Sequence, residues 1–178
     1  MSFLELAQKR QSCRKYSSRE VSREMIGRCI EAARVAPSAC NSQPWYFIAV
    51  VDMALKKKAA EVAFSGIFKM NAFAKEAPVL VVVVRERSKY AARLGGSFRG
   101  VQYSLIDVGI ACDHFTLQAA EEGLGTCWLG WFNEQAVKKV LNLSRSSKID
   151  VILSVGYPQN NDIRIKNRKS LSEMSEIR

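Results

Sequence analysis

The sequence predicts a domain of the α/β or α+β class, in which helices cover a central β-sheet in three layers. Amphipathic helical patterns alternate along the chain with short apolar runs, which is typical of layered folds. The length of 178 residues suits one domain with one substantial core. A doubly wound dinucleotide-binding fold is disfavoured. The glycine-rich segment at residues 123–128 follows a helical pattern and has Trp128 where the third glycine should stand.

In the N-terminal half, the expected elements are a helix at residues 3–9, a helix from the N-cap Ser22 to about residue 35, a strand at 45–51, helices at 53–63 and 66–75, and a strand at 79–84. A serine hydroxyl can accept a hydrogen bond from a free N–H of the first helical turn. The strand at 45–51 is entirely apolar, so we expect it to be buried on both faces. The β-branched run at 79–84 predicts a central strand.

In the C-terminal half, the expected elements are a long helix at residues 101–122, an extended segment at 126–131, a helix from the N-cap Asn133 to residue 140, and a strand at 149–155. Residues 85–100 carry charges and three glycines without a period, which predicts a surface segment that shapes a binding site. Residues 157–178 are polar and basic. We expect one domain over residues 1–178, with 157–178 as a C-terminal extension.

The chain is strongly basic, with 27 Lys and Arg against 17 Asp and Glu. Eight of these cations fall in residues 9–34 and five in residues 164–178. Clusters at both ends suit an anionic ligand held by two distant parts of the chain, although nucleic acid stays an alternative. The five cysteines are an odd number without a CxxC pair, which favours reduced thiols and a cytoplasmic protein. No signal peptide or membrane-length apolar run is apparent.

Few side chains in the sequence could carry acid–base or nucleophilic chemistry alone. His114 is the single histidine, and it lies within the long helical pattern. A histidine-based metal site and a Ser-His or Cys-His nucleophile would need partners that are not evident in the sequence. We therefore expect no metal site, and we expect a cofactor to supply the chemistry.

Several polar segments could hold such a cofactor. Arg10, Ser12 and Arg14 alternate, so in an extended backbone they face the same side, and Lys166 and Arg168 repeat this spacing. Guanidinium and ammonium groups of this kind can bind a phosphate dianion. The turn-rich residues 37–45 add hydroxyl and amide groups that could hydrogen-bond a heteroaromatic ring.

Four segments resemble the motifs of the FMN-dependent nitroreductase family and occur in the family order. Two of them precede the long central helix and two follow it. They are Arg-x-Ser-x-Arg at 10–14, Pro-Ser-x-x-Asn-x-Gln-Pro-Trp at 37–45, Gly-x-Gly with a further glycine at 123–130, and Lys-x-Arg at 166–168. The resemblance implies an α+β fold with three α/β/α layers around a mixed, mainly antiparallel sheet. It also implies an intertwined homodimer with FMN at the subunit interface.

The resemblance also implies a role for individual residues toward FMN. Arg10, Gln11, Ser12, Lys166 and Arg168 would surround the phosphate and ribityl chain, and Arg14 would approach N1 and O2 of the ring. Pro37, Ser38, Ala39 and Asn41 would reach the flavin of the other subunit. Trp128, Leu129 and Gly130 would run along one ring face, with a backbone N–H toward the reactive nitrogen N5. Asn71 and Lys75 are nearby but do not align with a family contact. No side chain would be catalytic in itself.

The implied function is reduction of electron-poor acceptors, such as nitroaromatics or quinones, by NAD(P)H in a ping-pong hydride transfer. The same fold also supports reductive dehalogenation, azoline oxidation and flavin fragmentation, which the sequence does not separate. A non-catalytic nucleic-acid-binding module remains the alternative from another class. It is disfavoured because the chain lacks an aromatic and basic surface motif. We expect neither nucleic acid nor a membrane as a partner.

Overall fold

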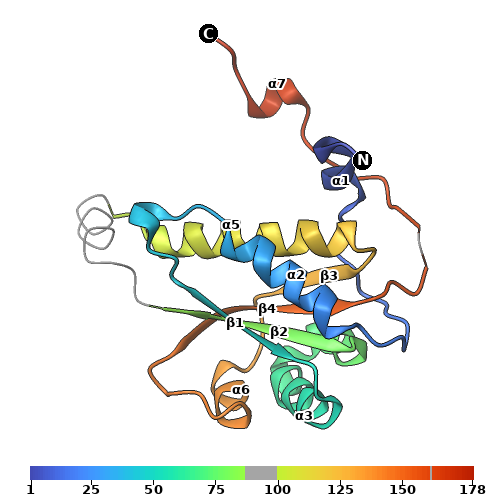
Figure 1. Cartoon of the computed structure of the whole chain (residues 1–178), viewed down its shortest axis with the longest axis vertical. Helices are drawn as coiled ribbons and strands as arrows, with labels where there is room; N and C mark the ends of the chain where they lie inside the picture. The colour runs from blue at the N-terminus through green and yellow to red at the C-terminus, as the bar shows by residue number, and fades with distance from the viewer. Residues whose placement is uncertain (87–99, 161) are drawn as a thin grey trace.

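The computed structural model describes residues 1–86, 100–160 and 162–178, and it shows three layers (Figure 1). A sheet of four strands forms the middle layer. One face of this sheet is covered by α2 (Arg23–Arg34) and α5 (Tyr103–Glu121), and the other by α3 (Met53–Ala63), η2 (Gly66–Glu76) and α6 (Glu134–Val140). The predicted three-layer α+β fold is confirmed.

The sheet has the strand order β1 (Trp45–Val50), β2 (Val79–Arg85), β4 (Lys148–Gly156), β3 (Gly125–Leu129). Neighbouring strands are antiparallel throughout. A parallel bridge between Ser12 and Thr126 adds the N-terminal segment beside β3, and it is the one parallel pairing in the described part of the chain. The antiparallel order excludes the doubly wound alternative, whose strands are mostly parallel.

The strand at the start of the sheet differs from its prediction. We expected residues 45–51 to be buried on both faces, but β1 lies at the sheet edge and pairs with β2 alone. Tyr46 is 58% exposed there. An apolar run therefore did not distinguish an edge strand from a central one. The β-branched β2 does lie in the centre, and six of its seven residues are buried.

The helix ends follow from local capping. The side chains of Ser22, Asp52 and Asn133 each accept a hydrogen bond from a backbone N–H in the first turn of the following helix. The region expected to be helical at residues 66–75 is a 3₁₀ helix, η2. The short helices α1 (Phe3–Lys9) and α7 (Leu171–Met174) flank the domain, and α7 was not expected from the weak pattern of the C-terminal extension.

Two apolar clusters form the core, one on each side of the sheet. Phe115 of α5 stacks on Phe47 of β1, with 5.9 Å between ring centroids, and Cys29 and Cys112 are fully buried in the same cluster. Phe64 is fully buried in the cluster under α3 and α6. The core thus fixes α5 rigidly against the sheet, which matters because both ends of α5 border candidate site segments.

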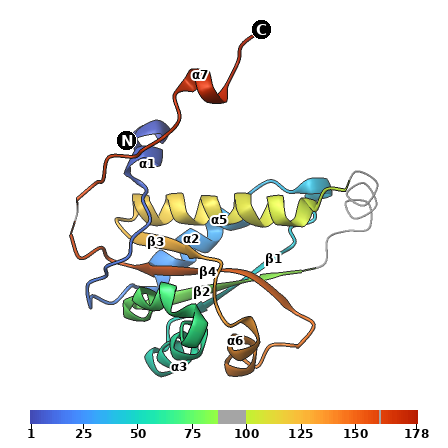
Figure 2. The ribbon, with the colours of Figure 1, turned by 180° about the vertical axis from the view of Figure 1, so that it is seen from behind.

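The two ends of the chain lie at the same end of the molecule. Figures 1 and 2 show α1 and the C-terminal extension together above the C-terminal end of α5. Most of the expected surface segment at residues 85–100 falls at 87–99, outside the described residues. Within the described ranges, no helix is long and apolar enough to cross a membrane.

A partly buried charge cluster beneath the sheet gives a prediction about pH. Glu134 accepts hydrogen bonds from Lys138, Lys148 and the backbone N–H of Ile149. Burial alone would raise the pKa of Glu134, but the two ammonium groups lower it to about 2. Lys138 is also buried, and its ammonium forms an ion pair with this carboxylate at 2.8 Å.

We expect Glu134→Gln to lower the free energy of unfolding at pH 7 by about 3 kcal/mol, because the ionised carboxylate is favoured in the folded state. The folded pKa lies below the unfolded one, so this stability is present above about pH 4.5 and is lost as pH falls toward 2. Urea unfolding of the wild type and of Glu134→Gln at pH 7 and pH 3 measures this contribution. The difference in free energy of unfolding between the two proteins should be smaller at pH 3. An equal difference at both pH values would contradict the assignment.

Candidate functional site

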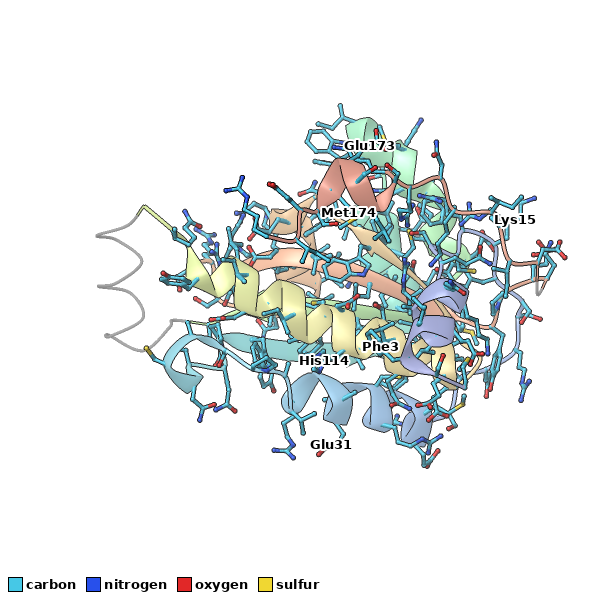
Figure 3. The ribbon with its side chains drawn as sticks, turned by 90° about the horizontal axis from the view of Figure 1, so that it is seen from above. Phe3, Lys15, Glu31, His114, Glu173 and Met174 are labelled. Atoms are coloured by element: carbon cyan, nitrogen blue, oxygen red, sulfur yellow. The ribbon has the colours of Figure 1, made fainter. Side chains whose placement is uncertain are left out.

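A cleft of about 820 Å³ opens where the N-terminal segment, the C-terminal extension and the turn before β3 meet. Its lining is rich in cations, namely Lys9, Arg10, Arg14, Lys15, Arg19 and Arg164. Asp162 is the one carboxylate among the described lining residues. In the described part of the chain, none of the six cations forms an ion pair with a carboxylate. Figure 3 shows Lys15 at the molecular edge beyond the C-terminal end of α5.

Hydrogen bonds join the two ends of the chain along one wall of this cleft. The backbone of Ser17 donates to Tyr157, and that of Gln159 donates to Lys15. Further along, the Gln11 amide donates to the carbonyl of Asp162 at 2.6 Å and accepts from Arg164 at 3.2 Å. The residues after β4 therefore run antiparallel to residues 11–17, and this pairing places distant cations together.

Lys166 marks the point where the cations of both ends converge. Burial lowers the pKa of Lys166, and the positive charges of Arg10 and Arg168 lower it further, so both guanidinium groups lie within electrostatic range of its ammonium. Its ammonium donates to the carbonyls of Ala7 and Arg10, each at 2.6 Å. Two of its three donors are thus used within the protein. A hydrogen bond thus joins Lys166 to Arg10, and Arg168 lies within electrostatic range of Lys166, although Lys166 and Arg168 do not line the cleft.

Arg14 and Ser12 lie beside β3. Ser12 pairs with Thr126, and its neighbour Cys13 donates its backbone N–H to the Thr126 carbonyl at 2.8 Å. The guanidinium of Arg14 is exposed and lies 5.9 Å from the centroid of the Phe73 ring of η2. Arg14 is thus a solvent-accessible cation between η2 and β3.

The end of β3 leads to an aromatic cluster. Leu129 is buried, whereas Trp128 and Gly130 are exposed. Trp131 packs against Phe68 of η2, with ring centroids 5.2 Å apart and planes tilted by 52°. Its indole N–H donates to the carbonyl of Ile67 at 3.1 Å. These rings form a partly exposed apolar surface next to Gly130.

Asn71 and Lys75 could not be aligned with a family contact from the sequence alone. In the structure the two residues have different neighbours. The Asn71 amide donates to the Trp131 carbonyl at 2.9 Å, so it lies next to the segment after β3. Lys75 forms an ion pair with Glu61 at 2.7 Å. Asn71 is therefore placed to support the segment that contains Gly130, and Lys75 is engaged on α3.

The polar loop at residues 37–45 does not reach this cleft. It contacts the N-terminal part of α5, where Ala39 donates its N–H to Asp107. The cleft includes Ala120, near the other end of α5. At 1.5 Å per residue, the separation of 13 positions between Asp107 and Ala120 spans about 20 Å. Pro37, Ser38, Ala39 and Asn41 are thus separated from Arg10 and Ser12 within one chain.

The sequence reasoning missed Arg164, Lys15 and Arg19. The Arg164 guanidinium donates to the Ser12 carbonyl, and the Arg19 guanidinium lies 3.9 Å from the centroid of the Tyr157 ring. A signal for Arg164 was present, since the alternation of Lys166 and Arg168 extends back to it. Arg19 could not be found from spacing, because its position depends on how the chain turns back after β4.

The remaining reactive side chains have structural surroundings. Burial raises the pKa of the Cys29 and Cys112 thiols to about 12, and it also raises the pKa of Cys13 and Cys127. A thiol in this state is a poor nucleophile. His114 donates from Nδ1 to the Ala32 carbonyl and so joins α5 to α2. Among the described residues, no group of His, Cys, Asp or Glu could hold a metal ion.

Comparisons with known proteins find relatives over most of the chain. The model of the family described as "Nitroreductase family" matches residues 7–69 and 66–157. A putative NADH dehydrogenase/NAD(P)H nitroreductase of Archaeoglobus fulgidus is 32% identical over 160 residues, which cover 88% of this chain and 85% of the relative. An iodotyrosine deiodinase of Thermotoga neapolitana is 29% identical, with 86% and 87% covered. A nitroreductase family protein of Clostridium novyi superposes with a TM-score of 0.77 at 30% identity, covering 91% and 89%.

Proposed function

Because the chain belongs to the nitroreductase family, we propose that it is an FMN-dependent oxidoreductase. It would take a hydride from NAD(P)H and pass electrons to an electron-poor acceptor such as a nitroaromatic or a quinone. The observation that carries this proposal is the hydrogen bond from Lys166 to the Arg10 carbonyl at 2.6 Å, which joins opposite ends of the chain beside a cationic cleft. The name of the Archaeoglobus relative supports an NAD(P)H-linked reductase.

The residues present fit FMN. A phosphate dianion needs several donors and positive charge, and the lining offers six cations against one carboxylate. Arg10 and Arg168, the Ser12 hydroxyl and the remaining donor of Lys166 would hold the phosphate and ribityl chain. Gln11 contributes indirectly, since its amide fixes the C-terminal extension at Asp162 and Arg164.

Bound FMN would supply the hydride-accepting chemistry, and the chain would bind and orient it. Arg14 would stabilise negative charge on the pyrimidine side of the ring, because its guanidinium is accessible and has no carboxylate partner among the described residues. A backbone N–H at Gly130 would orient the ring without adding charge, and Trp128 and Leu129 would lie along one face. Trp131 and Phe68 would exclude water beside it.

A second copy of the chain would complete the site. The loop with Pro37, Ser38, Ala39 and Asn41 lies about 20 Å along α5 from the cleft of its own protomer. A homodimer in which α5 packs beside its counterpart would bring this loop to the other cleft. We therefore propose a homodimer with FMN at the interface, a single domain over residues 1–178 with 157–178 as its extension, and a cytoplasmic location.

Reductive dehalogenation is the second candidate, and the similarity to an iodotyrosine deiodinase over most of both chains favours it. The two activities would share the flavin and differ in the acceptor. A panel of nitroaromatic, quinone and halogenated phenol acceptors, assayed with and without oxygen, separates them. A nucleic-acid-binding module would instead show duplex binding that falls steeply with salt.

The test of the proposed function is the absorbance spectrum of the purified protein, together with identification of the released cofactor. We expect a yellow protein, a flavin spectrum that NADH or NADPH bleaches under anaerobic conditions, and FMN after denaturation. A colourless protein that also fails to quench the fluorescence of added FMN would overturn the proposal.

A further inference from the structure

Lys166, in the C-terminal extension, makes its closest polar contacts with the backbone at the other end of the chain. Its ammonium donates to the carbonyls of Ala7 and Arg10, each at 2.6 Å. The side chain is half-buried and does not line the cleft. Figures 1 and 2 show the extension passing beside α1. Two of the three ammonium donors are therefore directed at α1, whereas the family resemblance implied a residue that contacts phosphate.

The two carbonyls lie at the C-terminal end of α1. The Ala7 carbonyl belongs to the last turn, and Arg10 is the C-cap, whose backbone N–H donates to the Leu6 carbonyl. Carbonyls at this end of a helix lack partners within the helix and carry the negative end of its dipole. An ammonium that satisfies two of them is a C-terminal cap. All seven residues of α1 are at least partly exposed, so this cap compensates for weak packing.

The cap acts on Arg10 more than on the neighbouring segments. Ser12, two residues further on, is paired with β3 by a parallel bridge. The extension is also held before it reaches Lys166, because the Gln11 amide donates to residue 162 and accepts from residue 164. Removing Lys166 would therefore leave both of these attachments in place and free the carbonyl of Arg10.

The charges around Lys166 indicate an anionic ligand beside it. Burial lowers the pKa of Lys166, and the positive charges of Arg10 and Arg168 lower it further. Within the described ranges, none of these three cations forms an ion pair with a carboxylate. Like charges at this range repel one another in the free protein, and a bound phosphate dianion would offset that repulsion.

We propose that Lys166 is a positioning residue, which holds Arg10 at the FMN phosphate through its bonds to the Ala7 and Arg10 carbonyls. This inference rests on the proposed function. The bonds to α1 contribute more to FMN affinity than a direct contact from the remaining ammonium donor. Without Lys166 the end of α1 is uncapped and the backbone of Arg10 is free to shift, while Ser12 keeps its pairing with β3.

A double-mutant cycle separates positioning from direct contact. Fluorescence quenching measures the dissociation constants of FMN and of riboflavin, which lacks the phosphate, with the apoprotein. Lys166→Met is made in the wild type and in Arg10→Ala. Arg168→Ala is made in the same two backgrounds for comparison, because its guanidinium donates to the carbonyl of Asn167 and not to α1. Lys169→Met is the matched control, since it removes an exposed lysine from the same extension.

We expect Lys166→Met to weaken FMN binding about tenfold in the wild type, and by no more than about twofold in Arg10→Ala. A residue that acts through Arg10 has little left to act on once that guanidinium is gone. Arg168→Ala should cost about tenfold in both backgrounds, as expected for an independent phosphate contact. Riboflavin binding should stay within about twofold throughout, as should FMN binding by Lys169→Met.

A tenfold loss from Lys166→Met in the Arg10→Ala background would show direct contact and overturn the positioning role. Wild-type FMN affinity in the single variant would also overturn it, as would an equal loss of riboflavin, which indicates a general structural role. Lys166→Ala repeats the cycle where the methionine variant does not fold. A wild-type protein that binds neither FMN nor riboflavin would instead refute the proposed function, so the two failures are distinguishable.

Discussion

Replacing Gly125 with alanine is expected to separate the N-terminal segment from β3 and to disrupt both the fold and the site. A Cβ at this position would lie 2.6 Å from Cβ and 2.8 Å from Sγ of Cys13, and 3.1 Å from a ring carbon of Pro158. Both neighbours belong to segments held by hydrogen bonds, so neither can move freely. Overpacking of this kind costs about 1–3 kcal/mol. The displaced residues carry Ser12 and Arg14, so FMN affinity should fall at least tenfold.

The measurements are urea unfolding of the apoprotein and titration with FMN. Gly27→Ala is the control, because a Cβ there has no neighbour within 4 Å and Gly27 lies in the exposed face of α2. Alanine should stabilise that helix by up to about 1 kcal/mol. If Gly125→Ala retained both its urea midpoint and its FMN affinity, the close approach of Cys13 to β3 would have no role in forming the site.

Local rules predicted most of the fold. The caps at Ser22 and Asn133 placed the starts of α2 and α6, because capping depends only on residues of the first turn. The central position of β2 followed from its β-branched composition. These features are encoded within a few residues, so a single sequence contains enough information to place them.

Features that depend on distant residues were not predictable. The edge position of β1 is decided by which strands pair, and its apolar side chains gave the opposite expectation. The place of Arg19 in the cleft depends on the return of residues 157–164 past residues 11–17. The hydrogen bond between the polar turn and Asp107 joins residues 68 positions apart. In each case the sequence contains the residues, but only the fold determines their neighbours.

The position of the polar turn also explains why the site that we propose requires two chains. Its tie to Asp107 and the cations at the other end of α5 are both fixed to the same rigid helix. A conformational change within one protomer could close this gap only by breaking the core around α5. Association of two copies requires no such change, and for this reason the proposed function includes a homodimer.

Replacing Arg14 with alanine is expected to weaken FMN binding about 10- to 100-fold and to slow reduction of the remaining bound flavin by NAD(P)H at least tenfold. A charge-assisted contact to a ligand is worth about 1.5–3 kcal/mol, and the loss should be larger for the reduced, more negative ring. Stability should change little, because Arg14 is exposed and its guanidinium lies 5.9 Å from the centroid of the Phe73 ring.

Stopped-flow reduction under anaerobic conditions and FMN titration measure the two effects separately. Arg145→Ala is the matched control, since it removes one exposed positive charge from the turn between α6 and β4, away from the cleft. A general effect of net charge on FMN binding would appear in both variants, whereas a specific one appears in Arg14→Ala alone.

Because Arg14 would act mainly on the reduced ring, the flavin reduction potential of this variant should also become more negative. An unchanged potential with full flavin content and normal turnover would show that Arg14 is only a surface cation.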